Sequence, residues 1–309
     1  MTGAEVVEVL SARLDGRGPR SDGAKVALVI EGGGMRGIVS ASMAHAVEQS
    51  GLLSVVDLVI GTSSGAVNAA ATVSGAIGAF ADSYSTVFSS REFIDLRRVM
   101  RNRPVVDSPL IVDHLEQLFN LGGFVDGRHG APQLAVVATD VDASEACVLT
   151  DYTDREDMLR SIHASGLLPL LGGPPLKHRG RRWLDGGILE PVPVASAASL
   201  GATHAIVLST RPAGTGPSTG PVDRVVQRHL RGLNPSLAAA YAQRSSRYLR
   251  TMTDIANGQS AGVFTLLMAP ALGSPLPSRL ERSAVRLQTA QRAHTARALD
   301  LLNDLHLVA

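Results

Sequence analysis

The sequence VIEGGGMRGIVS, residues 29–40, joins an apolar segment to three consecutive glycines and then to a helical pattern. The apolar segment begins at Lys25 as KVALVI, a composition typical of a buried strand. Between Met35 and Gln49, apolar residues recur every four positions, which predicts a helix with one apolar stripe. The stretch therefore predicts a strand, a tight turn and a helix. The glycines indicate that this turn closely approaches another group.

The same alternation continues along the chain. The segment VVDLVI (55–60) precedes a helical pattern that starts at Ser64. Later strand candidates are QLAVVATD (133–140), ACVLT (146–150), HAIVLST (204–210) and VFTLLMA (263–269). Strands that alternate with helices predict an α/β fold with a mostly parallel sheet and right-handed crossovers.

We expect one domain over residues 25–309, preceded by an N-terminal extension, residues 1–24. Residues 83–121 are predicted to be a helical insertion, and residues 222–309 to be a helix-rich part of the same domain. The apolar side chains of the insertion fit two interpretations. They form either a small satellite core or the inner face of a cap over a site.

Composition limits the classes of function. Hydrophobic residues make up 45% of the 309 residues and charged residues 18%, which excludes a disordered chain. The net charge of +1 gives no sign of a nucleic-acid surface. From Asp223 onward, however, eleven arginines face five acidic residues. This excess fits either a solvated helical face or a patch for a membrane or a partner.

The single cysteine, Cys147, excludes an intrachain disulfide and a cysteine metal cluster, and fits a cytoplasmic protein. No signal peptide is recognised at the start, and no segment approaches the ~18 apolar residues of a spanning helix. We therefore expect any membrane contact to be peripheral.

The segment VVDLVIGTSSGAVNAA (55–70) contains Gly61, Ser63 and Gly65 in a GxSxG pattern between a strand and an alanine-rich helix. This is the context of a nucleophile elbow, in which small neighbours let a strained turn close and present the serine hydroxyl. The helix N-terminus behind it stabilises negative charge. Ser63 is therefore the candidate nucleophile.

A serine that attacks an ester creates an oxyanion, which backbone N–H groups must stabilise. Gly32, Gly33 and Gly34 follow a neighbouring parallel strand, so they can offer such groups at the same edge of the sheet. The alternative is a dinucleotide-binding turn, since GGGMRG is formally GxGxxG. Two features argue against a dinucleotide. Glu31 would place a carboxylate near the phosphates of the dinucleotide, and the second strand is not followed by an acidic residue that could bind the ribose.

The proton of Ser63 needs a base. Five histidines follow the serine in an order that would suit a Ser–Asp–His triad: His178, His204, His229, His294 and His306. None of them lies in a distinctive context. Asp185, in RRWLDGGILEPVPV, comes after a short strand and before two glycines, so a buried carboxylate could act as the base directly. The alternative is a structural Asp-Gly-Gly turn.

Taken together, GGGMRG, GTSSG and DGG, each at a strand end, resemble the patatin-like phospholipase family. The resemblance extends from about Lys25 to Leu302 and includes DSPLIVDHLEQLF (107–119), ATDVDASEACVL (138–149) and HASGLLPLLGGPP (163–175). It implies a three-layer α/β/α sandwich and acyl-ester hydrolysis by a Ser–Asp dyad.

The resemblance implies roles for individual residues. Ser63 is the nucleophile, Asp185 the general base, and Gly32, Gly33 and Gly34 form the oxyanion hole. The supporting motif residues are Arg36, Gly37, Gly61, Gly65, Gly186 and Gly187. Arg36 is expected to steady the glycine loop, with contact to a lipid phosphate as the alternative. The sequence departs from the family pattern at Ser165–Pro169 and at Glu190, which we expect to alter the pocket wall.

Asp140 and Asp142 form a DxD pair that suits either a divalent cation or a turn, and we expect no metal and no cofactor. The sequence thus predicts a soluble esterase that acts on a lipid or other acyl ester, with no nucleic-acid partner. Two alternatives stay open. One is an α/β-hydrolase-type esterase with a histidine triad, and the other is a lipid-binding or regulatory protein with a vestigial site.

Overall fold

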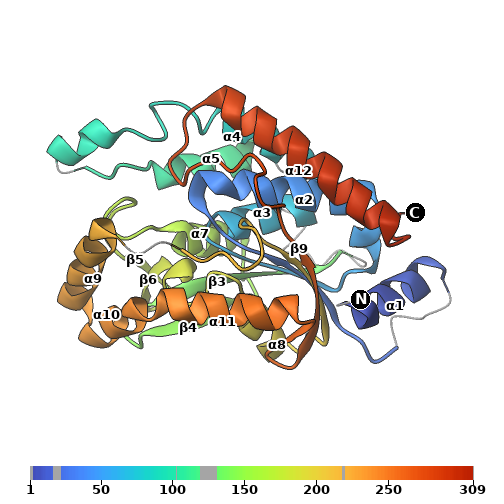
Figure 1. Cartoon of the computed structure of the whole chain (residues 1–309). Coiled ribbons are helices and arrows are strands. Elements are labelled where there is room, and N and C mark those ends of the chain that lie inside the picture. Colours follow the sequence, from blue (N-terminus) through green and yellow to red (C-terminus); the bar gives the residue numbers. More distant parts are fainter. Residues whose placement is uncertain (1–2, 17–21, 102, 119–130, 218–219, 309) are drawn as a thin grey trace.

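The computed structural model describes residues 3–16, 22–101, 103–118, 131–217 and 220–308. Within these ranges a mixed sheet lies between layers of helices (Figure 1). The strands are β1 Val26–Ile30, β2 Leu58–Thr62, β3 Gln133–Asp140, β4 Glu145–Leu149, β5 Leu176–His178, β6 Arg181–Asp185, β7 His204–Leu208, β8 Gln259–Ser260 and β9 Val263–Met268. The α-helices are α1 Ala4–Leu14, α2 Gly37–Gln49, α3 Ser64–Val73, α4 Ile77–Thr86, α5 Ser108–Leu118, α7 Arg155–Gly166, α8 Val194–Ser199, α9 Pro221–Leu233, α10 Pro235–Ala242, α11 Arg244–Ala256 and α12 Ala284–Asp304. Short 3-10 helices are η1 Gly34–Arg36, η2 Leu52–Val55, η3 Leu96–Arg101 and η4 Gly186–Ile188.

The centre of the sheet is parallel and its edges are antiparallel. Strands β3, β2, β1, β7 and β9 are neighbours in this order and run in one direction. Strands β4 and β6 both pair antiparallel with β3, and β5 and β8 continue the two edges in the same antiparallel sense. The predicted α/β fold with a mostly parallel central sheet between helical layers is confirmed. The antiparallel edges do not follow from the sequence pattern.

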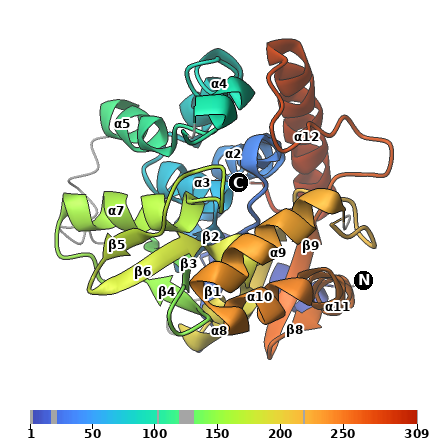
Figure 2. The same cartoon turned by 90° about the vertical axis from the view of Figure 1, so that its left-hand side faces the viewer.

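The two faces of β1 pack against different helices. Val26, Leu28 and Ile30 belong to a large core shared with α2, α3 and α12. Ala27 and Val29 belong to a second core shared with α8 and α11. Because successive strand side chains alternate between faces, the buried run VALVI requires a helical layer on each side. Figure 2 shows these layers, with α2, α3, α4 and α12 above the sheet and α8 to α11 below it.

The predicted helical insertion (83–121) differs from its expectation at its start and in its middle. Helix α4 already begins at Ile77. Between α4 and α5 the chain forms a projecting loop, which an antiparallel bridge between Ile94 and Val106 closes at its base and which carries η3 at its tip. Residues 119–121 lie outside the described ranges.

The N-terminal segment packs onto the same core as the rest of the chain. Val6 and Leu10 of α1 are fully buried in the large core. The Arg13 guanidinium forms ion pairs of 2.8 Å with Asp22 and 2.7 Å with Asp57. No α-helix in the described ranges combines the length and the apolar composition needed to cross a bilayer.

Candidate active site

Ser63 lies at the turn between β2 and α3, at the carboxyl end of a central strand. Its backbone has φ 60° and ψ −130°, a conformation that costs a non-glycine residue about 1–3 kcal/mol. A Cβ at Gly61 would overlap the carbonyl oxygen of Gly65, and a Cβ at Gly65 would overlap the carbonyl oxygen of Ile30. A residue with a side chain therefore does not fit at either position. The strand, turn and helix expected around Ser63 are present.

Asp185 reaches the same edge of the sheet from an antiparallel strand. It ends β6, where it pairs with Ala138 of β3. The Ser63 hydroxyl donates a 2.6 Å hydrogen bond to Asp185 Oδ2, and the N–H of Gly187 donates a 2.7 Å bond to Oδ1. A Cβ at Gly186 would overlap a carbonyl oxygen of β3. The two glycines after Asp185 thus allow close packing and hold the carboxylate.

The Asp185 carboxyl group is almost completely buried, with 2% of the residue exposed. Burial raises its pKa above the usual value, while hydrogen bonds from Ser63 and Gly187 and the charge of Arg279 oppose the rise. A desolvated carboxylate is a stronger base than an exposed one. This carboxylate therefore has both the position and the basicity to take the Ser63 proton.

Ser165 holds the backbone at Ser63. Its hydroxyl accepts a 3.0 Å hydrogen bond from the Ser63 N–H and donates one of 2.6 Å to the carbonyl oxygen of Val137. The run Ser165–Pro169, expected to alter the pocket wall, reaches that wall through two of its residues. Gly166 and Leu168 line the pocket, whereas the Ser165 side chain is buried against β3.

The glycine loop (residues 31–37) packs directly against the turn at Ser63. A Cβ at Gly32 would overlap a carbonyl oxygen of β2 and lie 2.7 Å from Ser63 Cβ. Gly34 has φ 59°, and a Cβ there would lie 2.6 Å from the carbonyl oxygen of Arg279. The close approach that the three glycines predict is therefore to the Ser63 turn on one side and to a C-terminal segment on the other.

The N–H groups of the three glycines have different partners. Gly33 donates a 2.9 Å hydrogen bond to Ser64 Oγ, a residue that sequence analysis did not single out. In the described part of the chain, the N–H groups of Gly32 and Gly34 have no acceptor. Gly34 and Ser63 also line the same pocket. Gly32 and Gly34 thus have free donors, and the donor of Gly33 is free only once Ser64 releases it.

The end of the glycine loop is held by α3. The Gly37 carbonyl oxygen accepts a 2.9 Å hydrogen bond from Asn68 Nδ2. Arg36 is different, because its buried Nε has no hydrogen-bond partner among the described residues. Burial, and then the charges of Arg211 and Arg279, lower the Arg36 pKa to about 10. The expectation that Arg36 steadies the loop stays a prediction.

Glu31 anchors the start of the glycine loop to the segment after β7. Its carboxylate accepts hydrogen bonds from the Ser209 hydroxyl (2.8 Å), the Thr210 N–H (2.5 Å) and the Tyr248 hydroxyl (3.0 Å). The buried carboxylate is therefore fully engaged with protein groups. This arrangement agrees with the sequence argument that Glu31 disfavours a pyrophosphate at this turn.

An apolar pocket with a volume of about 60 Å³ opens onto Ser63. The rings of Phe80, Tyr84, Phe88 and Phe93 contribute to its wall and contact one another, with the closest pair of centroids 4.9 Å apart. The same rings belong to the large core, so the alternative of a separate satellite core is wrong. Tyr84, Phe88 and Phe93 of the insertion thus form part of the pocket wall.

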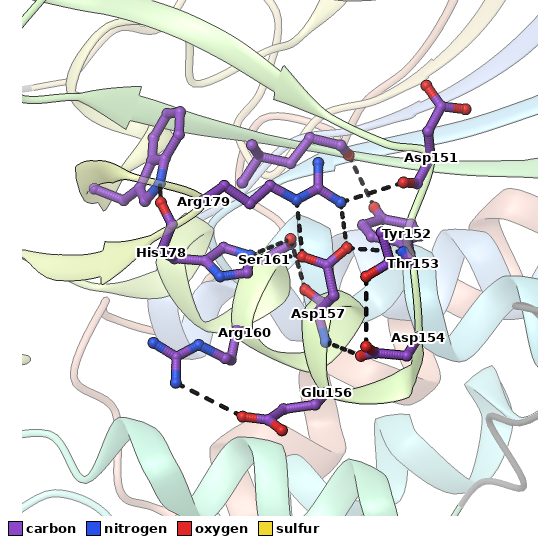
Figure 3. Close-up of polar contacts among 12 residues, drawn as sticks. Asp151, Tyr152, Thr153, Asp154, Glu156, Asp157, Arg160, Ser161, His178 and Arg179 are labelled. Carbon is purple, nitrogen blue, oxygen red and sulfur yellow. Dashed lines mark hydrogen bonds and ion pairs between the residues drawn. The ribbon is translucent and has the colours of Figure 1, made fainter.

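His178 lies in a buried polar network with Asp157, Ser161 and Arg179 (Figure 3). Its Nε2 lies 3.1 Å from Asp157 Oδ1 and 3.1 Å from Ser161 Oγ, and Arg179 bonds both oxygens of Asp157. The hydrogen bond from Arg179 is the main cause that lowers the Asp157 pKa, to about 2. This network joins α7 to the turn after β5, which is a structural role.

The hydrogen-bond partners of the other histidines named by the sequence analysis show whether one of them could be a third member beside the dyad. Within the described ranges, no hydrogen bond joins Ser63 or Asp185 to any of His204, His229, His294 and His306. His204 bonds the neighbouring Thr203 hydroxyl, and His294 bonds a backbone carbonyl. The geometry therefore offers no third member for a triad among the described residues.

The DxD pair stabilises a turn. Asp140 accepts the N–H of Asp142 at 2.9 Å and forms a 2.8 Å ion pair with Arg181. Asp142 pairs with Arg182. The described ranges hold no group of three or more histidine, cysteine or acidic side chains that could share a metal ion. Both carboxylates are thus engaged in turn and ion-pair contacts.

Glu190 does not line the pocket at Ser63, so its expected place in that wall is wrong. Its carboxylate accepts the Ser196 N–H at 2.9 Å and the Ser196 hydroxyl at 2.5 Å. Burial raises the Glu190 pKa. It lines a different cavity together with Arg247, beneath α11.

The segment that carries these loops is similar to known proteins. A family model described as "Patatin-like phospholipase" matches residues 28–198. Uncharacterized protein YjjU of Escherichia coli is 29% identical over 199 residues, which is 61% of this chain and 52% of that protein. Patatin-like phospholipase domain-containing protein 4 of Homo sapiens is 29% identical over 63 residues, 20% of this chain and 25% of that protein. The chain thus spans about half the length of the first relative and a quarter of the second.

Among solved structures, VipD from Legionella pneumophila matches with a TM-score of 0.37 and 13% identity, over 90% of this chain and 67% of that one.

Proposed function

The chain belongs to the patatin-like phospholipase family, and we propose that it hydrolyses the carboxylic ester of a lipid, with Ser63 as the nucleophile and Asp185 as the general base. The observation that carries this proposal is the 2.6 Å hydrogen bond from Ser63 Oγ to Asp185 Oδ2. It lies beside an apolar pocket whose aromatic wall suits an acyl chain.

In the first half of the reaction, Ser63 Oγ attacks the ester carbonyl carbon while its proton passes to Asp185. The carbonyl oxygen becomes an oxyanion in a tetrahedral intermediate. Collapse of this intermediate breaks the bond to the alcohol, which leaves with the proton from Asp185. The acyl group stays on Ser63 as an ester.

In the second half, water replaces the alcohol. Asp185 takes a proton from the water, whose oxygen attacks the acyl carbon, and the second tetrahedral intermediate releases the carboxylic acid. The proton then returns from Asp185 to Ser63 Oγ. One ester and one water thus give one alcohol and one acid, and both side chains end in their starting states.

The glycine loop is proposed to stabilise the two oxyanions. The N–H groups of Gly32 and Gly34 have no acceptor within the described residues, and that of Gly33 can exchange the Ser64 hydroxyl for the oxyanion. Loss of one such donor costs about 100- to 1000-fold in kcat in well-studied serine hydrolases.

A histidine triad is the less favoured mechanism, since no described histidine bonds either member of the dyad. Alanine replacement of His178, His204, His229, His294 and His306, one at a time, is expected to leave turnover largely intact. A loss of about a hundredfold or more in a variant with an unchanged Tm would identify a third catalytic residue.

The proposal is tested by labelling with a fluorophosphonate probe. The native protein is expected to form a covalent adduct, and Ser63→Ala is expected to form none. Ser161→Ala is the matched control, because Ser161 is fully buried and bonds His178 rather than Asp185, so this variant is expected to form the adduct as the native protein does. A native protein that gives no serine-dependent adduct would instead be a binding or regulatory protein with a vestigial site.

The proposed enzyme uses no metal or cofactor and has no nucleic-acid partner. We place it in the cytoplasm, with peripheral contact to the membrane that holds its substrate.

A further inference from the structure

Large aliphatic side chains that are strongly exposed lie on three segments of the molecule. Within the described ranges, every large hydrophobic residue that is more than half exposed belongs to η3, to α9, or to the connection from β9 into the first turn of α12. These residues are Leu96 (64%), Val99 (63%), Met100 (82%), Val222 (72%), Val225 (57%), Leu272 (79%) and Val285 (73%). Exposed aliphatic groups gathered in this way indicate an interaction surface.

Two of the three segments reach the wall of the pocket at Ser63, and the third, α9, lies at the same end of the molecule as the loop with η3 (Figure 1). The base of the loop that carries η3 supplies Phe93, Ile94 and Val106 to the pocket wall. The connection after β9 is bound to the glycine loop, because the N–H of Met35 donates a 3.0 Å hydrogen bond to the carbonyl oxygen of Arg279. Helix α9 and the loop with η3 both project at the left-hand end of Figure 1, away from the two termini, and face the viewer in Figure 2.

The same segments carry arginines that lack acidic partners. Seven of them form no ion pair with any described residue: Arg97, Arg101, Arg224, Arg228, Arg231, Arg279 and Arg282. Of the acids in or beside these segments, Asp223 pairs with Arg244 at 2.5 Å and Glu281 with Arg286 at 3.6 Å, whereas Asp95 accepts the Arg97 N–H and forms no ion pair with a described residue. The segments that carry the exposed aliphatic groups thus also carry an excess of unpaired positive charge.

We propose that η3 and α9, with the start of α12, form a docking surface for an anionic lipid bilayer. Its exposed aliphatic residues are Leu96, Val99, Met100, Val222, Val225, Leu272 and Val285. Its aliphatic groups enter the boundary between head groups and acyl chains, and its arginines contact lipid phosphates. Docking in this way turns the pocket entrance toward the membrane.

Charge favours a bilayer over a second copy of this chain as the occupant. Two copies that met through this surface would bring their unpaired arginines together, which is unfavourable. An anionic bilayer instead supplies phosphates to all of them at once. The identification of the site entrance rests on the proposed function, whereas the docking itself does not need catalysis.

Docking is tested by co-sedimentation with vesicles, using the full chain with Ser63→Ala so that the lipid stays intact. The vesicles contain phosphatidylcholine alone or phosphatidylcholine mixed with phosphatidylglycerol. We expect binding to the mixed vesicles, weaker binding at higher salt, and little binding to phosphatidylcholine alone. The salt effect follows from screening of the arginine contacts.

The aliphatic contribution is tested with the triple variant Leu96→Ser, Val99→Ser, Met100→Ser. We expect its affinity for mixed vesicles to fall about tenfold or more, equivalent to about 1.4 kcal/mol. Val308→Ser is the matched control, since Val308 is 43% exposed near the C-terminus, at the opposite end of the molecule. The control is expected to bind as the parent does.

The charge contribution is tested on the other segment. Arg224→Gln with Arg228→Gln on α9 is expected to weaken binding to mixed vesicles about thirtyfold, since each arginine near an anionic surface contributes about 1 kcal/mol. Arg297→Gln on α12 is the matched control and is expected to change binding little. The double arginine variant also tests the docking surface if the triple variant of η3 does not fold.

The proposal is overturned if mixed vesicles do not bind the parent, or if both sets of variants bind them as the parent does. Self-association that the η3 variant abolishes, with no vesicle binding by the parent, would identify a second copy as the occupant and also overturn it. Hydrolysis of a water-soluble ester by the chain with Ser63 intact separates the two proposals. If this chain does not hydrolyse the ester, the proposed function is refuted. If it hydrolyses the ester but the parent does not bind mixed vesicles, only the docking surface is refuted.

Discussion

Replacement of Gly32 by alanine tests the contact between the glycine loop and the nucleophile. The backbone of Gly32 does not have a positive φ, so alanine can adopt its conformation without strain. The effect is therefore steric: the new methyl group would overlap a carbonyl oxygen of β2 and lie 2.7 Å from Ser63 Cβ. Because both obstacles belong to the turn that presents Ser63, the loop and this turn must move apart.

The size of the effect follows from this displacement. Overpacking of a well-packed site costs about 1–3 kcal/mol, which lowers Tm by roughly 2–10 °C for a chain of this size. A displacement of about 1 Å at the reacting groups costs on the order of a hundredfold in rate. We therefore expect kcat/KM for a water-soluble ester to fall by about a hundredfold, with a Tm decrease of a few degrees.

Gly232→Ala is the matched control. Gly232 lies in α9 and does not have a positive φ, and a methyl group added there would meet no heavy atom within 4 Å. Alanine there is expected to keep kcat/KM unchanged and to raise helix stability by up to about 1 kcal/mol. If Gly32→Ala retains kcat/KM within about twofold of the native value, the glycine loop does not pack against the nucleophile in the way described.

Three further predictions concern the surroundings of the dyad. Ser165→Ala leaves the Ser63 N–H without its acceptor, so we expect a loss of about 1–3 kcal/mol in the free energy of unfolding and about a tenfold lower kcat/KM; an unchanged Tm and rate would contradict the contact. Because burial raises the Asp185 pKa and only the ionised carboxylate accepts a proton, kcat/KM should rise with pH to a plateau, with a midpoint above the ordinary value of about 3.9; a midpoint below that value would exclude a desolvated base. The Asp157 pKa of about 2 lies below its ordinary value, so its contribution to stability is complete above about pH 4 and is lost as the pH falls toward 2. Asp157→Asn should therefore lower Tm at pH 7 and reduce the loss of Tm between pH 4 and pH 2, and an identical pH dependence in both proteins would count against the Arg179 ion pair.

The parts of the site that follow from local sequence are predictable. Strand β1 with its glycines, and β2 with GTSSG, combine an apolar run with a glycine-rich turn and a helix, so their order and parallel direction follow from general rules. These rules use only local sequence. They are sufficient to predict that the two glycine turns meet at one edge of the sheet, and the parallel pairing of β1 with β2 places them there.

The parts that depend on distant contacts are not predictable in this way. Asp185 ends a short antiparallel strand whose direction depends on the pairing of β6 with β3. Ser165 follows 102 positions after Ser63, and no local pattern connects them. The expected place of Glu190 is wrong for the same reason, because its partner Ser196 belongs to a helix that faces another cavity.

The projecting loop between α4 and α5 has closely spaced apolar residues, and this spacing predicts a helix. Its base is instead bridged between Ile94 and Val106, so the aromatic residues before it turn inward to the pocket. The tip at η3 has apolar residues that face solvent, which a pattern of hydrophobic residues cannot distinguish from a buried helix.

The most direct test of the dyad is the kcat/KM of Ser63→Ala, Asp185→Asn and the double variant on one water-soluble ester. If the two side chains act as a unit, each single variant falls by about a thousandfold or more, and the double variant falls no further than the worse of the two. If Asp185→Asn keeps most of the native rate, or if the two losses multiply in the double variant, Ser63 and Asp185 do not act together and the proposed mechanism is wrong.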